Sequence, residues 1–165
     1  MQILQHQQIE QIVKRIAIEI LEQNIDEKEI IFAGINNNGI HLAQLLMNEL
    51  LNISKLNLTL TRITVNPAAP LDQEILLEIP AKQLSKKVLI IVDDVANTGR
   101  TLFYAFQPLL ETMMKKVEIA VLVNRMHKSF PISVDYKGIE LATTLQQNIE
   151  VVFSDNKKKN LARVL

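Results

Sequence analysis

The chain has 165 residues, which suits a single domain with one sizeable hydrophobic core. Hydrophobic residues make up 48% and charged residues 22% of it, which excludes a disordered chain, and the absence of cysteine excludes disulfides and thiolate chemistry. Because 18 Lys and Arg balance 18 Asp and Glu, the protein has no net positive charge that would attract nucleic acid or an anionic membrane. A net charge of zero does not exclude a local basic patch.

The first half of the chain alternates helical and strand patterns. Apolar residues at helical spacing predict an amphipathic helix over residues 9–24. The wholly apolar run 30–33 predicts a strand buried on both faces, and a polar turn over residues 34–39 leads to a helix over residues 40–51. Alternation over residues 56–61 predicts a half-exposed strand.

The second half continues this alternation. Residues 65–73 contain two prolines and predict a mobile loop, which a short strand at 75–79 follows. Residues 88–92 are the clearest central strand, and a helix runs from Gly99 to about Lys116. Two more strands are expected at residues 117–123 and 149–153, with a mixed segment at residues 124–147 between them.

This order predicts the α/β class, as a single domain with a mostly parallel central sheet flanked by helices and right-handed crossovers. The basic run at residues 156–159 is interpreted as a solvated tail rather than an anion-binding patch. The three histidines show no metal-ligand spacing. Residues 1–6 lack the features of a signal peptide and the apolar runs are too short to span a bilayer, so we expect a cytoplasmic protein.

The candidate site follows the central strand. In open α/β sheets, ligands bind beyond the carboxyl ends of strands, where a loop leads into a helix. Gly99 lets the backbone approach an anion closely, and the hydroxyls of Thr98 and Thr101 add donors. Asp93 and Asp94 stand just before this loop and can accept hydrogen bonds from neighbouring sugar hydroxyls. The combination predicts a site for a phosphorylated sugar.

Each half of this motif has a second interpretation. Two aspartates after a strand also suit a magnesium site of a phosphotransfer enzyme, and Thr98-Gly99-Arg100-Thr101 also suits an ordinary helix start. Either element alone is weak evidence, whereas the two at this spacing are specific.

Residues 88–102 resemble the diphosphoribosyl-binding signature of type I phosphoribosyltransferases. Within that superfamily the chain is most similar to the pyrimidine-operon attenuation regulators that double as uracil phosphoribosyltransferases. The similarity extends to the family's first helix, to its strand before the flexible loop and to its base-binding hood, at residues 15–20, 58–62 and approximately 124–147.

The resemblance implies a role for each segment. Asp93 and Asp94 would hold the ribose hydroxyls, residues 34–39 would form the diphosphate loop, and residues 65–73 would form a lid. Tyr136 would stack on the nucleobase while the backbone of Lys137 reads its edge. The 5-phosphate would be wrapped by Ala96, Asn97, Thr98, Gly99, Arg100 and Thr101.

The resemblance also implies the reaction and its partners. A nucleobase displaces diphosphate from 5-phosphoribosyl-1-diphosphate, in a reaction that depends on orienting the reactants and stabilising the leaving group. Mg²⁺ is the expected cofactor; it would be held through the substrate, with no direct protein ligand assigned and with Asp93 or Asp94 as the candidates for one. We expect a homodimer, as is usual in the superfamily, and no tight RNA binding, because the chain carries no net charge.

The sequence departs from the family at the diphosphate loop. The family's pattern is Gly-Ile, a basic residue, then Thr-Arg-Gly, whereas this chain has Gly34-Ile35-Asn36-Asn37-Asn38-Gly39. By this resemblance, Asn36, Asn37, Asn38 and Gly39 would face the diphosphate without a positive charge. Arg62 is kept as a catalytic candidate, although Ile63-Thr64 replaces the acidic pair that normally follows it.

Three functions fit these residues. The first is an active phosphoribosyltransferase for a pyrimidine such as uracil, since Asn97 replaces the acidic group of purine-specific relatives. The second is a regulator that senses nucleotide or diphosphoribose and binds messenger RNA. The third is a binding-only descendant whose activity was lost with the charges of the diphosphate loop.

Overall fold

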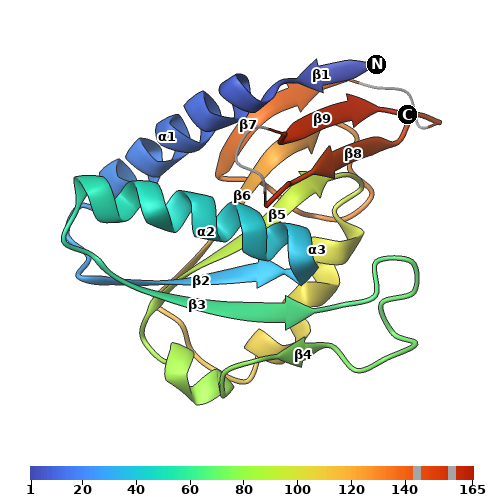
Figure 1. The fold of residues 1–165 in the computed structure, drawn as a ribbon. Coiled ribbons are helices and arrows are strands. Elements are labelled where there is room, and N and C mark those ends of the chain that lie inside the picture. The colour runs from blue at the N-terminus through green and yellow to red at the C-terminus, as the bar shows by residue number, and fades with distance from the viewer. Residues whose placement is uncertain (143–145, 156–158) are drawn as a thin grey trace.

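A six-stranded sheet forms the centre of the computed structural model, which describes residues 1–142, 146–155 and 159–165 (Figure 1). All its strands are parallel except the short edge strand β4, so the predicted α/β class with a mostly parallel sheet is confirmed. In sheet order the strands are β4 (Leu76–Leu77), β3 (Asn57–Thr64), β2 (Glu29–Ile35), β5 (Val88–Ala96), β6 (Lys116–Arg125) and β7 (Tyr136–Leu141).

Helices cover both faces of this sheet. Helices α1 (His6–Gln23) and α2 (Asn36–Ile53) pack on one face, while α3 (Arg100–Ala105) and the 3₁₀ turns Ala81–Leu84 and Gln107–Leu109 pack on the other (Figure 1). Successive apolar residues of the buried strands point alternately to the two layers, which explains why these strands are continuous apolar runs. None of the described helices is long and apolar enough to cross a bilayer.

A second, smaller sheet is antiparallel and joins the two ends of the chain. It consists of β1 (Gln2–Leu4), β9 (Leu161–Val164) and β8 (Ile149–Val152), in that order. None of these three strands falls within residues 124–147, the predicted hood. Within that segment, β7 instead extends the central sheet. Residues 143–145 of the predicted hood and residues 156–158 of the basic run lie outside the described residues.

Helix α3 is much shorter than predicted. The helical pattern suggested an end near Lys116, but the α-helix stops at Ala105 and a 3₁₀ turn containing Pro108 follows. Proline has no backbone N–H to donate and its ring collides with the preceding turn, so it ends an α-helix. The chain then reaches β6 through a turn rather than through further helix.

Candidate functional site

The two aspartates lie at the carboxyl end of β5, inside the strand rather than after it. Asp93 pairs in register with Val121 of β6, and the ladder continues to Ala96. Each carboxylate accepts a hydrogen bond from the next backbone N–H, at 2.9 Å from Asp94 N to Asp93 Oδ1 and 2.9 Å from Val95 N to Asp94 Oδ1. These bonds fix both side chains against the strand end.

Asp93 is the more buried of the pair, with 8% of its surface exposed. Burial raises the pKa of the Asp93 carboxyl well above its usual range, and the neighbouring charge of Asp94 raises it further. A buried carboxylate with a second carboxylate beside it favours ligands that bring positive charge or hydrogen-bond donors. Sugar hydroxyls and hydrated cations are such ligands.

The loop 96–101 turns away from the end of β5 and lines a cavity of about 160 Å³, together with Asp93 and Pro67. Gly99 has a φ of 86°, a conformation that residues with a side chain adopt at a cost. Helix α3 begins at the next residue and has only six residues, so the loop's own N–H groups, rather than a helix dipole, are the donors available to an anion.

Substituting Gly99 by Ala is expected to disturb this loop. The added Cβ would lie 3.1 Å from the side chain of Ile132, in addition to the cost of a positive φ, which is roughly 1–2 kcal/mol. We expect the free energy of unfolding to fall by about that amount and affinity for a sugar phosphate to fall as the loop shifts. Urea unfolding and calorimetry with ribose 5-phosphate measure the two effects; an unchanged affinity would show that the loop does not contact the phosphate.

The asparagine-rich segment is a direct junction of strand and helix rather than the predicted polar turn over residues 34–39. Strand β2 ends at Ile35 and α2 begins at Asn36, which takes a positive φ of 51°. A side chain at Gly39 would come within 2.4 Å of the Val92 carbonyl oxygen, so the first turn of α2 packs directly on β5. Gly39 therefore allows this close packing.

Each of the consecutive asparagines bonds to a different segment. Asn36 exchanges two hydrogen bonds with the backbone of Val65, at 2.8 and 3.1 Å. Asn37 Oδ1 accepts a 2.6 Å bond from Arg62 Nη1 of β3. Asn38 Nδ2 donates to Asp94 Oδ2 at 2.7 Å and to the carbonyl of Val151 in β8 at 3.1 Å. The three amides thus tie α2 to the start of the predicted lid, to β3, to the acidic pair and to the small sheet.

A second cavity, of about 370 Å³, lies between this junction and the acidic pair. It adjoins the cavity of loop 96–101, because Pro67, Asp93, Val95, Asn97 and Thr101 line both. Among the residues that the structure describes, the lining of the second cavity includes the three asparagines and both aspartates but neither lysine nor arginine. The structure therefore brings together the predicted carboxylates, loop 96–101 and the asparagines, with Arg62 adjacent through Asn37.

The predicted lid, residues 65–73, contacts the site at its first turn. Arg100 Nη2 donates to the carbonyl of Pro67 at 2.6 Å, and Pro67 lines both cavities. Together with the bonds between Asn36 and Val65, this contact places the start of the loop over the site.

Tyr136 and Lys137, the predicted base-binding residues, lie away from the lining of the two cavities. Tyr136 is 2% exposed and its hydroxyl donates to Glu118 Oε2 at 2.7 Å, so stacking on a base is wrong for this residue. Burial, with the adjacent Glu118, raises the pKa of that hydroxyl. The Lys137 side chain pairs with Glu140, and its carbonyl accepts a bond from Arg15 at 3.3 Å. Neither residue lines the two cavities.

Residues that sequence reasoning missed stand behind loop 96–101. Arg125 Nη1, at the end of β6, donates to Asn97 Oδ1 at 3.3 Å. Lys128 Nζ reaches the carbonyl of Ala96, and the N–H groups of Ser129 and Phe130 reach that of Thr98. Because these contacts join segments about thirty residues apart, only the basic and polar character of residues 124–130 could have suggested them.

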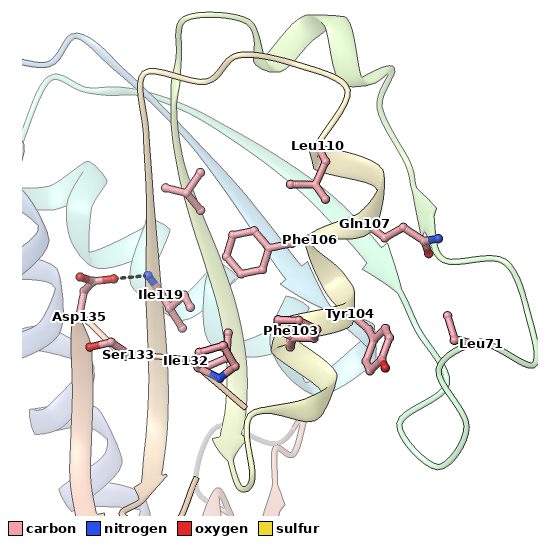
Figure 2. Close-up of a pocket in the computed structure, with 12 residues that line it drawn as sticks. Leu71, Phe103, Tyr104, Phe106, Gln107, Leu110, Ile119, Ile132, Ser133 and Asp135 are labelled. Carbon is pink, nitrogen blue, oxygen red and sulfur yellow. Dashed lines mark hydrogen bonds between the residues drawn. The ribbon is translucent and has the colours of Figure 1, made fainter. Parts of the chain in front are cut away.

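A larger cavity of about 650 Å³ lies against α3 and is lined mainly by apolar and aromatic side chains (Figure 2). Figure 2 shows Phe103 and Tyr104 on α3, and Asp135 Oδ2 accepting a 2.8 Å bond from the N–H of Ile119. Neither Asp93 and Asp94 nor any residue of loop 96–101 lines it. Asp93, Asp94 and loop 96–101 line the two smaller cavities, which we therefore take as the site.

The chain is similar to known proteins in sequence and in fold. The family described as phosphoribosyl transferase domain matches residues 1–158. Bifunctional protein PyrR of Bacillus pumilus is 34% identical over 173 aligned residues, which cover 98% of this chain and 95% of the relative. Bifunctional protein PyrR of Alkaliphilus metalliredigens is 32% identical, with 96% and 91% covered.

Among solved structures, the hypoxanthine-guanine phosphoribosyltransferase of Bacillus anthracis superposes with a TM-score of 0.78 at 16% identity, covering 99% of this chain and 97% of that one. The hypoxanthine phosphoribosyltransferase of Trypanosoma cruzi gives a TM-score of 0.78 at 16% identity, covering 99% and 95%. At these identities the structures establish the fold, and the match of sequence over nearly the whole chain establishes the family. This chain belongs to the phosphoribosyltransferase family.

Proposed function

We propose that the protein binds 5-phosphoribosyl-1-diphosphate and transfers its phosphoribosyl group to a nucleobase, a pyrimidine such as uracil. The observation that carries this proposal is the position of Asp93, which lines both adjoining cavities. A substrate with phosphate groups at both ends of a ribose needs two anion sites. Between them it needs groups that accept hydrogen bonds from the ribose hydroxyls. Loop 96–101, the aspartates and the asparagine junction occur in that order across the site.

The chain's own groups orient the reactants. The 5-phosphate lies in the cavity of loop 96–101, where backbone N–H groups and the Thr98 and Thr101 hydroxyls donate to it. Asp93 and Asp94 accept hydrogen bonds from the ribose hydroxyls. The diphosphate then faces the amides of the asparagine junction. The nitrogen of the base attacks the anomeric carbon as the bond to diphosphate breaks, and the lid excludes water from that bond.

The paired carboxylates also fit Mg²⁺. This ion prefers oxygen ligands and commonly takes most of them from substrate phosphates and water. The described residues contain no group of three or more His, Cys, Asp or Glu side chains that could hold an ion. Asp93 or Asp94 would therefore share the ion with the substrate, and the bound ion would neutralise charge on the leaving diphosphate.

The preference for a pyrimidine rests on Asn97 and on the relatives. Asn97 lies at the site, with its side-chain oxygen bonded to Arg125, and it offers a neutral amide where purine-specific relatives have an acid. Relatives that carry the name bifunctional protein PyrR match nearly the full length of the chain. Both observations favour a pyrimidine over a purine.

The test is a direct assay. The protein is incubated with Mg²⁺, 5-phosphoribosyl-1-diphosphate and, separately, uracil, orotate, hypoxanthine or adenine, and nucleotide is measured by chromatography. We expect nucleotide with uracil and none with the purines. Nucleotide from hypoxanthine alone would overturn the pyrimidine assignment. Absence of nucleotide from every base, with the diphosphate still bound, would favour the second candidate.

That second candidate is a binding protein that senses diphosphoribose or nucleotide without turning it over. It is favoured by the cavity at the asparagine junction, which no lysine or arginine of the described part of the chain lines. A hydrogen bond from a charged donor contributes about 1.5–3 kcal/mol against about 1 kcal/mol for a neutral one. The leaving diphosphate is therefore less stabilised here than at a basic loop.

Tight RNA binding is not expected of either candidate. Phosphate contacts dominate affinity for RNA, and the 18 basic residues of this chain are balanced by 18 acidic ones. Filter retention of a structured RNA at about 150 mM salt should give no submicromolar binding. Tight binding that weakens steeply with added salt would contradict this prediction and assign the protein a regulatory role.

A further inference from the structure

We infer that Lys128 is a positioning residue for phosphate binding, because it fixes the orientation of the backbone of loop 96–101 from behind. The inference rests on the proposed function, since the ligand concerned is the 5-phosphate of a ribose. Lys128 does not line the cavity that the loop encloses. It therefore acts through the loop rather than on the ligand.

The Lys128 ammonium group donates hydrogen bonds to backbone and side-chain oxygens around the loop. Nζ donates to Asn124 Oδ1 at 2.9 Å, to the carbonyl of Arg125 and, at 3.5 Å, to the carbonyl of Ala96. Asn124 and Arg125 end β6, while Ala96 ends β5 and begins the loop. The ammonium group thus joins the ends of two neighbouring strands at the point where the loop leaves the sheet.

The residues that follow Lys128 hold a second carbonyl. The N–H groups of Ser129 and Phe130 both donate to the carbonyl oxygen of Thr98, at 3.0 and 3.1 Å. The Phe130 ring packs against α3, with its centroid 5.3 Å from that of Phe103 and 6.0 Å from that of Tyr104. This packing keeps residues 128–130 against the outer side of the loop.

The two held carbonyls determine where two amides point. In a trans peptide, the N–H group points opposite to the C=O group of the same peptide unit. The carbonyls of Ala96 and Thr98 are directed at residues 128–130, so the N–H groups of Asn97 and Gly99 are directed away from them. Asn97 and Gly99 line the cavity, and residues 128–130 do not. These amides are therefore presented to an anion in the cavity.

A cation is better suited than a neutral group to this position. The ammonium group of Lys128 can donate to three acceptors at once, which the side chain of Met or Gln cannot do. Partial burial lowers the pKa of Lys128, while the charge of Glu140 opposes that effect. Lys128 also packs under Gly99, where a Cβ would lie 3.5 Å from Lys128 Cδ. The side chain therefore supports the loop sterically as well as by hydrogen bonds.

The test compares Lys128→Met with the wild-type protein by calorimetry, using ribose 5-phosphate and inorganic diphosphate as separate probes. We expect the variant to bind ribose 5-phosphate about 10- to 100-fold more weakly, as for a lost charged hydrogen bond, and to bind diphosphate as before. In the assay, KM for 5-phosphoribosyl-1-diphosphate should rise with little change in kcat. Lys128→Arg, which keeps several donors, should recover part of the affinity.

Lys115→Met is the matched control, because it removes a lysine at the opposite end of the sheet, where Lys115 pairs with Glu27. It should bind ribose 5-phosphate like the wild type. Equal affinity of Lys128→Met and the wild type would overturn the inference and leave the proposed function standing. Failure of the wild type itself to bind ribose 5-phosphate or 5-phosphoribosyl-1-diphosphate would overturn the proposed function instead.

A second measurement does not depend on how well the variant folds. In the ¹⁵N-labelled wild type, adding ribose 5-phosphate should shift the amide signals of Asn97 and Gly99 more than those of residues in β6. Shifts of this kind would support the inferred orientation. Unshifted amides at both positions in a protein that binds ribose 5-phosphate would refute it.

Discussion

The variant Asp93→Asn is expected to be more stable than the wild-type protein at neutral pH and, at the same time, to bind 5-phosphoribosyl-1-diphosphate more weakly. The asparagine oxygen can still accept the bond from the N–H of Asp94, so the local geometry is kept. Loss of a charged hydrogen bond to a ribose hydroxyl should reduce affinity by about 2 kcal/mol. Calorimetry with the substrate and thermal unfolding measure the two effects.

The gain in stability follows from the pKa of Asp93. Burial and Asp94 raise this pKa in the folded protein above its value in the unfolded chain. The contribution of Asp93 to stability is therefore fully present below the unfolded pKa, near 3.9, and is lost as pH rises through the raised folded pKa. Asparagine carries no such penalty. The stability difference between variant and wild type should be small near pH 4 and grow toward pH 8.

Asp26→Asn provides a control, since Asp26 is exposed on the turn after α1. Its effect on stability should stay within about 0.5 kcal/mol at either pH. A variant Asp93→Asn that is destabilised at pH 8 would show that the buried charge is compensated in the folded protein. Unchanged substrate binding would remove Asp93 from the site.

The central sheet and the loop after β5 could be predicted because their signals are local. The run of residues 88–92 is wholly apolar, and two carboxylates followed by a glycine loop are rarely found together for structural reasons alone. The strand nevertheless extended through Asp93 and Asp94, because the ladder with β6 continues past the apolar run. The end of β5 is determined by backbone pairing with β6, which cannot be predicted from side-chain hydropathy.

The small sheet could not be predicted, because its pairing is not local. Strand β1 pairs with β9, so Gln2 lies beside Arg163 at the other end of the sequence. Strands β1 and β9, of three and four residues, carry too little alternation to be recognised, whereas β8 coincides with the strand predicted at residues 149–153. The placement of Tyr136 failed for a related reason, since a resemblance assigned it to the site while its partners are Asn24, which caps the C-terminus of α1, and Glu118 of β6.

The hydrogen-bond partners of the three asparagines differ from what the sequence suggested for them. The sequence suggested that these amides are weak substitutes for charges at the diphosphate. In the structure, Asn38 already donates to Asp94 and to the carbonyl of Val151, so its amide helps to hold the site together. Asn37 instead accepts a bond from Arg62, which brings a cation next to the junction from another strand.

Arg62→Gln is therefore expected to slow phosphoribosyl transfer without weakening the binding of ribose 5-phosphate. Among the described residues, no carboxylate forms an ion pair with Arg62, and its only side-chain bond is to the neutral Asn37. Its charge is thus available to the developing diphosphate. Losing it should cost about 2–3 kcal/mol of barrier, a roughly 30- to 150-fold lower single-turnover rate.

The matched control is Lys55→Gln, which removes an exposed positive charge just before the same strand, at its opposite end. Its single-turnover rate should equal that of the wild type. Asn37→Ala should reproduce part of the Arg62 effect, because the guanidinium group would lose the amide that orients it. An Arg62→Gln protein that is as fast as the wild type would mean that the leaving group draws its charge from elsewhere, with Arg100 beside the lid as the next candidate. A loss of ribose 5-phosphate affinity would instead place Arg62 at the other end of the substrate.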